Sequence, residues 1–235
     1  LMRRTSLLPD PKTSFTTSDG LMAIGGKIDA AHLLEAYSKG IFPWFSEDQE
    51  IMWWCPDPRA VMRPEQFHAS RTLMKAIRSG RYRVSIDEKF IDVINSCAAP
   101  RDGDSATWIT KGMKAAYIGL HNLGYAHSIE VWLDNGLCGG LYGVSLGKIF
   151  FAESMFSNKS NGSKIALYAL SKILISNKFK LIDCQFMTPH LKTLGVREIP
   201  RNTFLDLLSG SSQANTNEDF WHLKPFNPAQ LESYK

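Results

Sequence analysis

The sequence contains no long hydrophobic run and no secretion signal. Because no stretch of about 18 consecutive apolar residues occurs, we expect no transmembrane helix and no membrane partner. The first residues, LMRRTSLLPDPKTS, contain two arginines followed by an apolar patch that is too short for a signal peptide. We therefore expect a cytoplasmic protein. Its 235 residues suit one large domain or two small ones.

Cysteine and histidine lack the spacings of metal sites. The four cysteines, Cys55, Cys97, Cys138 and Cys184, form no C-x-x-C and no paired Cys/His pattern, which disfavours a zinc site or a disulfide framework. Buried free thiols are the better interpretation. The six histidines show no H-x-x-x-H or H-E-x-x-H spacing, and His127 lies in an expected strand, where a structural role is favoured. We expect no metal.

Phosphate-binding loops are also missing. The glycines at 139–143 lie inside an expected strand and fit neither G-x-G-x-x-G nor a Walker lysine pattern. Glycine inside a strand instead suggests a bulge or a close ligand approach. The loop SNKSNGSK at 157–164 could offer backbone N–H groups to an anion, but an ordinary N-cap by Asn161 or Ser163 is the simpler expectation. It lacks the Q/R-x-x-G-x-G/A loop that binds pyrophosphate in acetyl-CoA enzymes, which disfavours a standard acetyltransferase.

What the sequence does contain is a clear order of elements. Helical periodicity predicts helices at 30–39, 70–79, 89–99, 109–123, 163–176, 188–194 and 202–209. Alternation predicts strands at 82–87, a hairpin at 128–144 turning at Asp134-Asn135-Gly136, and further strands at 148–154 and 180–186. The helix at 163–176 is apolar nearly all round, so it should be buried.

This order predicts an α/β (α+β) fold. A meander followed by a buried helix and a strand in the same sheet resembles an acetyltransferase-like (GNAT) core. We expect a small N-terminal lobe at residues 1–65 and a GNAT-like catalytic domain at 66–235, with a mixed sheet flanked by helices. The lobe carries the aromatic loop IFPWFSEDQEIMWWCPDPRAV, and a loop this aromatic must pack on something or bind something.

Three polar residues at strand ends are candidates for chemistry. Period two places Asp183 and Gln185 on one face of KLIDCQF and Cys184 on the other, and Glu153 ends the neighbouring strand KIFFAES. Each has a plainer explanation, since Asp183 and Gln185 could hold a loop by hydrogen bonds and Glu153 could be a solvated strand end. Convergence of all three favours a site.

Acids next to an amide suit direct transfer to an amine rather than a covalent intermediate. A carboxylate can hold and deprotonate an amine, and an amide can hydrogen-bond both the nucleophile and a carbonyl. Because an α-amino group titrates near about 7.7 to 8, part of it is already a free nucleophile at neutral pH. Positioning alone can then lower the barrier by roughly 7 to 11 kcal/mol.

A basic helix indicates a polyanionic partner. Arg71, Lys75 and Arg78 share one helical face, and Arg81 follows, in a chain of net charge +4. A solvated face is the alternative. Beside the tryptophan-rich loop, however, the helix suits nucleic acid, because charge meets the phosphate backbone while rings stack on an unpaired base.

Seven motifs resemble those of the leucyl/phenylalanyl-tRNA–protein transferase family. In chain order they are GIFPWF (40–45), WWCPDPRAV (53–61), TWITKGM (107–113), HSIEVW (127–132), GGLYGV (139–144), ESMFS (153–157) and LIDCQ (181–185). The resemblance runs from about residue 21 to 204 and includes the FW at 220–221. It implies transfer of Leu or Phe, and more weakly Met, from aminoacyl-tRNA to the N-terminal Arg or Lys of a protein, which creates an N-end-rule degradation signal. It implies no cofactor, and we expect a monomer.

The resemblance also implies residue roles. Gln185 would contact the attacking α-amine, with Asp183 polarising it, and Glu153 would orient the donor's amino group. Trp44 and Trp108 match the tryptophans that hold the terminal adenosine.

The resemblance further implies a set of substrate contacts. The six residues expected to form the donor side-chain pocket are Leu141, Tyr142, Phe150, Met155, Leu170 and Ile182. Ser157 is expected to contact the substrate outside this pocket. Relatives carry Met and Phe in place of Leu141 and Leu170, and Gly in place of Ala152. The two pocket replacements keep the pocket apolar but could shift the preference among Leu, Phe and Met, because one methylene is worth only about 1 to 3 kcal/mol.

Two other functions stay open at this point. One is a CoA-dependent N-acetyltransferase on the same core, against which the missing pyrophosphate loop and the aromatic lobe argue. The other is a non-catalytic RNA-binding module, in which the acid–amide trio would have no purpose.

Overall fold

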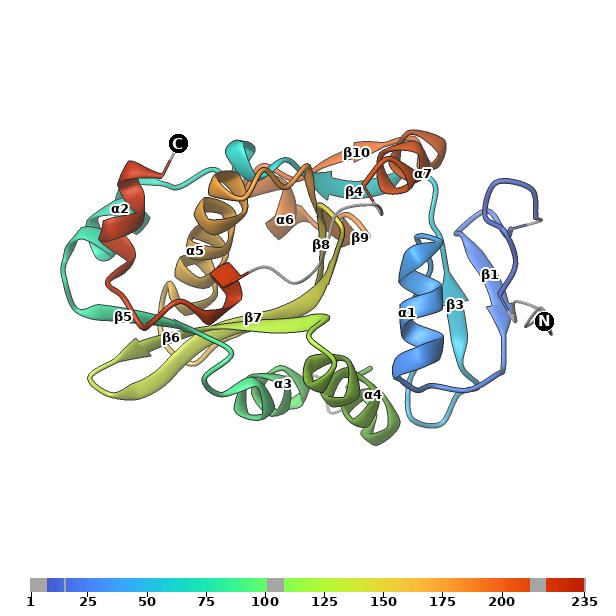
Figure 1. Cartoon of the computed structure of the whole chain (residues 1–235), viewed down its shortest axis with the longest axis horizontal. Helices are drawn as coiled ribbons and strands as arrows, with labels where there is room; N and C mark the ends of the chain where they lie inside the picture. Colours follow the sequence, from blue (N-terminus) through green and yellow to red (C-terminus); the bar gives the residue numbers. More distant parts are fainter. Residues whose placement is uncertain (1–7, 15, 101–107, 212–218, 235) are drawn as a thin grey trace.

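The computed structural model describes residues 8–14, 16–100, 108–211 and 219–234 (Figure 1). The first residue of the TWITKGM motif, at position 107, lies outside these ranges. Within them, no helix is both long and apolar enough to cross a membrane.

A small antiparallel sheet forms the N-terminal part of the fold. Its order is β1 (Leu21–Ile24), β3 (Met52–Trp54), β2 (Phe42–Pro43). Helix α1 (Ala30–Ser38) lies between this sheet and the rest of the molecule, as Figure 1 shows. The Asp29 side chain accepts the N–H of His32 and so starts the helix as the sequence predicts.

A seven-stranded mixed sheet forms the larger part. Its strands, in spatial order, are β10 (Arg197–Ile199), β4 (Arg59–Met62), β9 (Leu181–Gln185), β8 (Ile149–Ser157), β7 (Gly136–Leu146), β6 (Ala126–Leu133) and β5 (Tyr82–Ile86). Neighbours are antiparallel except for the parallel pair β8–β9. Asp134 and Asn135 both have positive φ, as the predicted two-residue hairpin turn requires.

Helices cover both faces of this sheet. The buried crossover helix α5 (Gly162–Ser176) connects β8 to β9 on one face, while α3 (Phe90–Ala98) and α4 (Lys111–Asn122) cover the other (Figure 1). The remaining helices are α2 (Arg71–Arg78), α6 (Pro189–Thr193), α7 (Arg201–Ser209) and the 3₁₀ turns η1 (Pro64–Gln66), η2 (Asp219–His222) and η3 (Pro228–Ser233).

The predicted architecture is confirmed: a small N-terminal sheet precedes a mixed sheet in which a meander, a buried helix and a parallel strand follow in order. Strand β4 belongs to the large sheet although it precedes residue 65. The domain boundary at 65 stays a prediction.

The polar and then aromatic-proline composition after Ser211 predicts a tail that lies over the surface, but residues of this C-terminal segment pack into the core. Trp221 is only 2% exposed, and its ring stacks on His127 at a centroid distance of 4.1 Å. Phe226 pairs with Val84 of β5 through backbone hydrogen bonds in both directions. Residues 219–234 therefore supply part of the core, and a buried aromatic side chain such as Trp221 contributes a large apolar area to it.

Candidate active site

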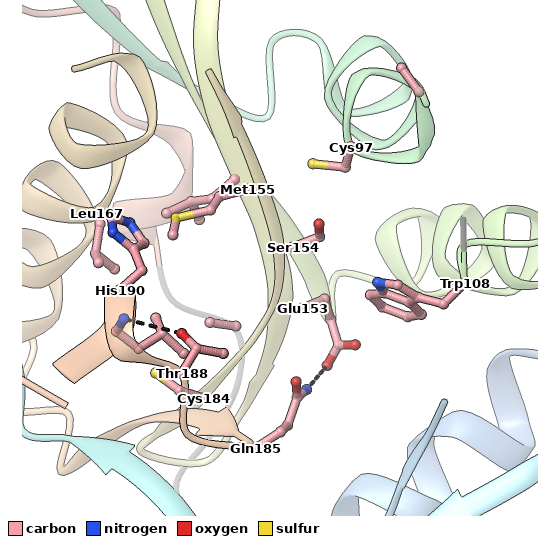
Figure 2. A pocket seen from close by; sticks show the side chains of 14 residues that line it. Cys97, Trp108, Glu153, Ser154, Met155, Leu167, Cys184, Gln185, Thr188 and His190 are labelled. Carbon is pink, nitrogen blue, oxygen red and sulfur yellow. Dashed lines mark hydrogen bonds between the residues drawn. The ribbon is translucent and has the colours of Figure 1, made fainter. Parts of the chain in front are cut away.

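A cavity of about 480 Å³ opens where β8 and β9 end beside α6 (Figure 2). Its lining residues are Cys97, Ala99, Trp108, Leu141, Ala152, Glu153, Ser154, Met155, Leu167, Cys184, Gln185, Thr188, His190 and Leu191. In Figure 2, Met155 and Leu167 lie on one side, while Glu153, Gln185 and Trp108 gather on the other. The cavity thus has an apolar part and a polar part, as a site that grips an apolar side chain beside a reacting group would.

A β-bulge places Glu153. In the pairing of β7 with β8, Tyr142 lies opposite Ser154 and Gly143 lies opposite Ala152, so Glu153 is the extra residue without a partner. Bulges of this kind re-aim one side chain and are frequent next to active sites.

The bulge also exchanges the two faces of β8. Before it, Phe151 packs in the core cluster on the α3/α4 side and Phe150 in the cluster on the α5 side. After it, Phe156 packs on the α3/α4 side and Met155 on the α5 side, so the parity of the strand has reversed. Strict period-two alternation would have placed Met155 on the same side as Phe151.

Glu153 is held by a hydrogen-bonded network and is only 8% exposed. The Gln185 side chain donates Nε2–H to Glu153 Oε1 at 2.9 Å, and the Tyr117 hydroxyl donates to Oε2 at 2.7 Å. The hydroxyls of Tyr37 and Tyr117 are themselves 2.7 Å apart. Tyr37 lies on α1, so the N-terminal part of the fold reaches this carboxylate.

Burial raises the pKa of Glu153 to about 7. The neighbouring hydroxyl groups of Tyr37 and Tyr117 oppose this rise in pKa, the charge of Asp183 adds to it, and the charge of Arg59 lowers the pKa. Burial also raises the pKa of both tyrosines well above the ordinary value. Glu153 therefore changes charge near neutral pH while the tyrosines remain hydrogen-bond donors.

Asp183 is clamped by an arginine. Arg59 Nε and Nη2 donate to Asp183 Oδ1 and Oδ2, each at 2.7 Å, and neither side chain is exposed. The third guanidinium nitrogen, Nη1, donates to the Gly40 carbonyl at 3.0 Å. The paired geometry is the bidentate form that makes arginine–carboxylate contacts strong and directional.

Gln185 connects the two acids. Its backbone N–H donates to Asp183 Oδ1 at 3.1 Å, while its side chain reaches Glu153. Its φ of 64° lies in the left-handed region, which non-glycine residues seldom adopt. The predicted convergence of Glu153, Asp183 and Gln185 is present in the structure.

Cys184, expected to point away, lines the cavity instead, and burial raises the pKa of its thiol.

Comparisons with known proteins show which family the chain belongs to. The leucyl/phenylalanyl-tRNA protein transferase family matches residues 61–209, and the N-terminal domain of the same family matches residues 26–57. A leucyl/phenylalanyl-tRNA–protein transferase of Pseudomonas syringae pv. syringae is 48% identical over 220 residues, covering 93% of this chain and 96% of the relative. The corresponding protein of Syntrophus aciditrophicus is 47% identical, covering 96% and 95%.

The chain belongs to the leucyl/phenylalanyl-tRNA–protein transferase family. It is accordingly an aminoacyltransferase. Among solved structures, L-PGS from Bacillus licheniformis aligns at 9% identity with a TM-score of 0.38, covering 82% of this chain and 73% of that one. At this TM-score and identity, the alignment gives no information about function.

The residues expected from the family motifs fall into two groups. Trp108, Leu141 and Met155 line the cavity. The others do not: Tyr142, Phe150, Leu170 and Ile182 are fully buried in the core, Ser157 is exposed, and Trp44 is 45% exposed. The role of each in substrate binding stays a prediction.

Trp44 lies in an aromatic cluster next to the end of β9. Its ring is 5.4 Å from that of Phe186 and 5.9 Å from that of Trp54. Phe186 directly follows Gln185. The exposed Trp44 ring therefore packs on the residue next to Gln185, which lines the polar part of the cavity.

Two N–H groups at the start of α5, after the loop that follows β8, already have acceptors within the chain. The N–H of Gly162 donates to the Lys159 carbonyl, and the N–H of Ser163 donates to Ser157 Oγ at 2.9 Å. A Cβ on Gly139 would lie 2.4 Å from the Gly162 carbonyl carbon, so β7 and the start of α5 touch through bare backbone. Asn161 is the N-cap residue of α5, as predicted, but its side chain makes no cap hydrogen bond, and Ser157 Oγ accepts the N–H of Ser163 instead.

The basic helix α2 carries both paired and unpaired charges. Arg78 forms a bidentate pair with Glu232 at 2.8 and 2.9 Å, and Arg81 lies 3.6 Å from Asp134. Arg71 and Lys75 are exposed and make no ion pair with any residue that the structure describes.

Sequence reasoning missed Arg59, Tyr37 and Tyr117. The sequence places Arg59 in the expected aromatic loop, although an arginine directly before the apolar residues Ala60, Val61 and Met62 can indicate a buried ion pair. The tyrosines look like ordinary helix residues and give no such signal.

His127 has the predicted structural role: its Nδ1 lies 2.7 Å from Asp87 Oδ2.

Proposed function

We propose that this chain transfers Leu or Phe, and more weakly Met, from aminoacyl-tRNA to the N-terminal Arg or Lys of acceptor proteins. The observation that carries the proposal is the Glu153–Gln185 pair at the border between the apolar and polar parts of the cavity. The N–H of Ser163 bonds to Ser157, and the start of α5 packs directly on the backbone of β7, which weighs against a CoA donor at this loop.

The donor's amino acid fits the two parts of the cavity. Leu141, Met155 and Leu167 offer apolar walls to its side chain. Such walls distinguish charged from apolar side chains strongly, but separate Leu from Phe by only about 1 to 3 kcal/mol. The Glu153 carboxylate accepts two side-chain hydrogen bonds in this structure. A carboxylate offers about four acceptor positions, so it can also take the donor's ammonium group.

The transfer step needs an oriented amine. Because Gln185 donates its NH₂ group to Glu153, its carbonyl oxygen is left as an acceptor for an N–H of the acceptor's α-amine. The amine nitrogen then attacks the ester carbon, the bond from that carbon to the tRNA 3′ oxygen breaks, and one proton passes from the nitrogen to that oxygen. Holding the two reactants in this geometry supplies most of the acceleration.

The tRNA would be held at two places. Trp108 and Trp44 would hold the terminal adenosine, and Arg71 and Lys75 on α2 would contact phosphates, with Arg78 and Arg81 at the margin because each already has an acidic neighbour. We place the reaction in the cytoplasm, where aminoacyl-tRNA is made, and in a monomer. The product would carry an N-terminal Leu or Phe and so become a degradation substrate.

A label-transfer assay tests the proposal. The protein is incubated with labelled Phe-tRNA and an acceptor beginning with Arg, without ATP or CoA, and in parallel with labelled acetyl-CoA. We expect label in the acceptor from Phe-tRNA alone, and none when the acceptor's α-amine is acetylated. An acceptor that stays unlabelled by Phe-tRNA would overturn the proposed function. Transfer that survives Asp183→Ala combined with Gln185→Ala would overturn the residue roles.

A further inference from the structure

Arg59 is held more firmly than a simple ion-pair partner needs to be. Its guanidinium lies between two aromatic rings, 4.7 Å from the centroid of Phe42 and 4.5 Å from that of Phe204. It also donates to Gly40 in addition to its two bonds to Asp183. The two aromatic rings and the hydrogen-bond acceptors of Asp183 and Gly40 together hold the Arg59 guanidinium in one position.

Asp183 does not reach the cavity. It is fully buried and is absent from the lining residues. Both of its oxygens accept from Arg59, and its further contact is the backbone N–H of Gln185. In this geometry, Asp183 acts on the reaction through the residue that does line the cavity, Gln185.

The conformation of Gln185 depends on that contact. A left-handed backbone is unfavourable for a non-glycine residue and persists only where its surroundings hold it. The bond from Gln185 N–H to Asp183 Oδ1 is such a hold, and the same conformation carries the side-chain amide to Glu153.

We propose that Arg59 is a positioning residue: it fixes Asp183, which holds Gln185 in the left-handed conformation that aims its amide at Glu153 and at the acceptor amine. The catalytic use of that amide rests on the proposed function. Because Gly40 and Phe42 belong to the N-terminal part of the fold, this part sets the geometry of the transfer step in addition to any contact with tRNA.

The proposal is tested with Arg59→Lys, which keeps the charge but loses the planar fork. We expect kcat to fall about 100-fold, as misplacement of a reacting group does, with the KM for Phe-tRNA changed less than about threefold. The matched control is Arg201→Lys, which alters another anchored arginine that donates to Thr16 and Cys55 away from the cavity. This control should leave kcat unchanged. A kcat for Arg59→Lys equal to that of the wild type would overturn the proposal.

A double-mutant comparison separates positioning from general damage. Gln185→Ala should reduce kcat strongly in the wild type but add little in the Arg59→Lys background, because the amide is already misdirected there. Independent, multiplying losses would contradict the proposal. If Arg59→Lys does not fold, Phe204→Leu loosens the same guanidinium without removing a hydrogen bond. It should lower kcat about threefold at constant KM, and an unchanged kcat would overturn the proposal.

A structural readout keeps this test independent of the proposed function. In a crystal structure of Arg59→Lys without substrate, Gln185 should leave the left-handed region and its side chain should lose Glu153. A Gln185 that retains both features would overturn the positioning role even in a chain that transfers nothing. A wild type without transfer activity would instead count only against the proposed function.

Discussion

Two buried glutamates of the large sheet have opposite surroundings. Glu130 on β6 is fully enclosed and accepts from four groups: Ser85 Oγ at 2.6 Å, Ser128 Oγ at 2.5 Å, and the N–H groups of Glu88 and Lys89 at 3.3 and 3.4 Å. Glu153 on β8 accepts from two side chains and borders the cavity.

Burial raises the pKa of both glutamates, so the pKa alone does not tell them apart. What distinguishes them is whether the fold supplies every hydrogen-bond partner. The fold supplies the hydrogen-bond donors around Glu130, and one of them is the N–H of Lys89 at the start of α3. Glu153, in contrast, still has acceptor positions for a ligand. The same contrast recurs on α2, where Arg78 is satisfied by Glu232 and Arg71 is open. Closed groups should matter for stability and open groups for function.

The largest expected difference is in activity. Glu153→Gln should lower kcat/KM for Phe transfer by about 100-fold or more, because the donor's ammonium loses its counter-charge in a dry site. Glu130→Gln, measured per folded molecule, should stay within about threefold of the wild type. Equal losses in the two variants would break the comparison.

The second difference is in stability, measured by urea unfolding at several pH values. Glu130→Gln should lower the free energy of unfolding by about 1 to 3 kcal/mol, because an amide NH₂ then faces donors. Glu153→Gln should have the opposite sign at high pH. Its carboxyl has a pKa of about 7 in the fold against an ordinary 4.5, so its ionisation costs stability as the pH rises. The variant's advantage should be absent near pH 4.5 and reach about 3 kcal/mol above pH 7. A pH-independent difference would contradict this.

The third difference is in tRNA binding. Arg71→Ala combined with Lys75→Ala should weaken Phe-tRNA binding about tenfold at low salt and flatten the salt dependence by nearly one unit of slope per lost phosphate contact. Arg78→Ala should change the slope less, since its charge is already met by Glu232. A steeper effect from Arg78→Ala would show that pairing does not remove a side chain from the tRNA surface.

The smallest expected effect is a shift of the pH profile. In the proposed mechanism the ionised form of Glu153 binds the donor's ammonium group, so kcat/KM should fall as the pH drops through about 7, because this ratio reports the pKa values of the free enzyme. Tyr117→Phe removes a hydrogen bond that opposes the rise in the Glu153 pKa, so this acid limb should move to higher pH by less than about one unit. Ser128→Ala is the matched change at Glu130 and should not move it. A shift to lower pH would be the wrong sign.

Local patterns predicted those parts of the fold and the site that depend on neighbouring residues. The meander and the buried α5 follow from alternation, the Asp134-Asn135 turn and apolar periodicity. The motif residues Glu153, Asp183 and Gln185 follow from strand ends. The Arg59–Asp183 pair joins residues 124 positions apart, and Tyr37 meets Tyr117 across 80. No periodicity reports contacts of that range. The bulge at Glu153 was equally hidden, because one extra residue leaves the pattern of letters intact.

That bulge has a consequence for how the position of Glu153 is maintained. Phe150 and Phe151 lie before the bulge, and Met155 and Phe156 lie after it. Phe150 and Met155 pack in the core on the α5 side and Phe151 and Phe156 in the other core, and this distribution requires the one unpaired residue between the two pairs. Inserting or deleting a residue here would move Glu153 and at the same time exchange a methionine and a phenylalanine between the cores. Such a change would destabilise the fold as well as displace Glu153. The packing of the two cores therefore maintains the position of a carboxylate that belongs to neither core.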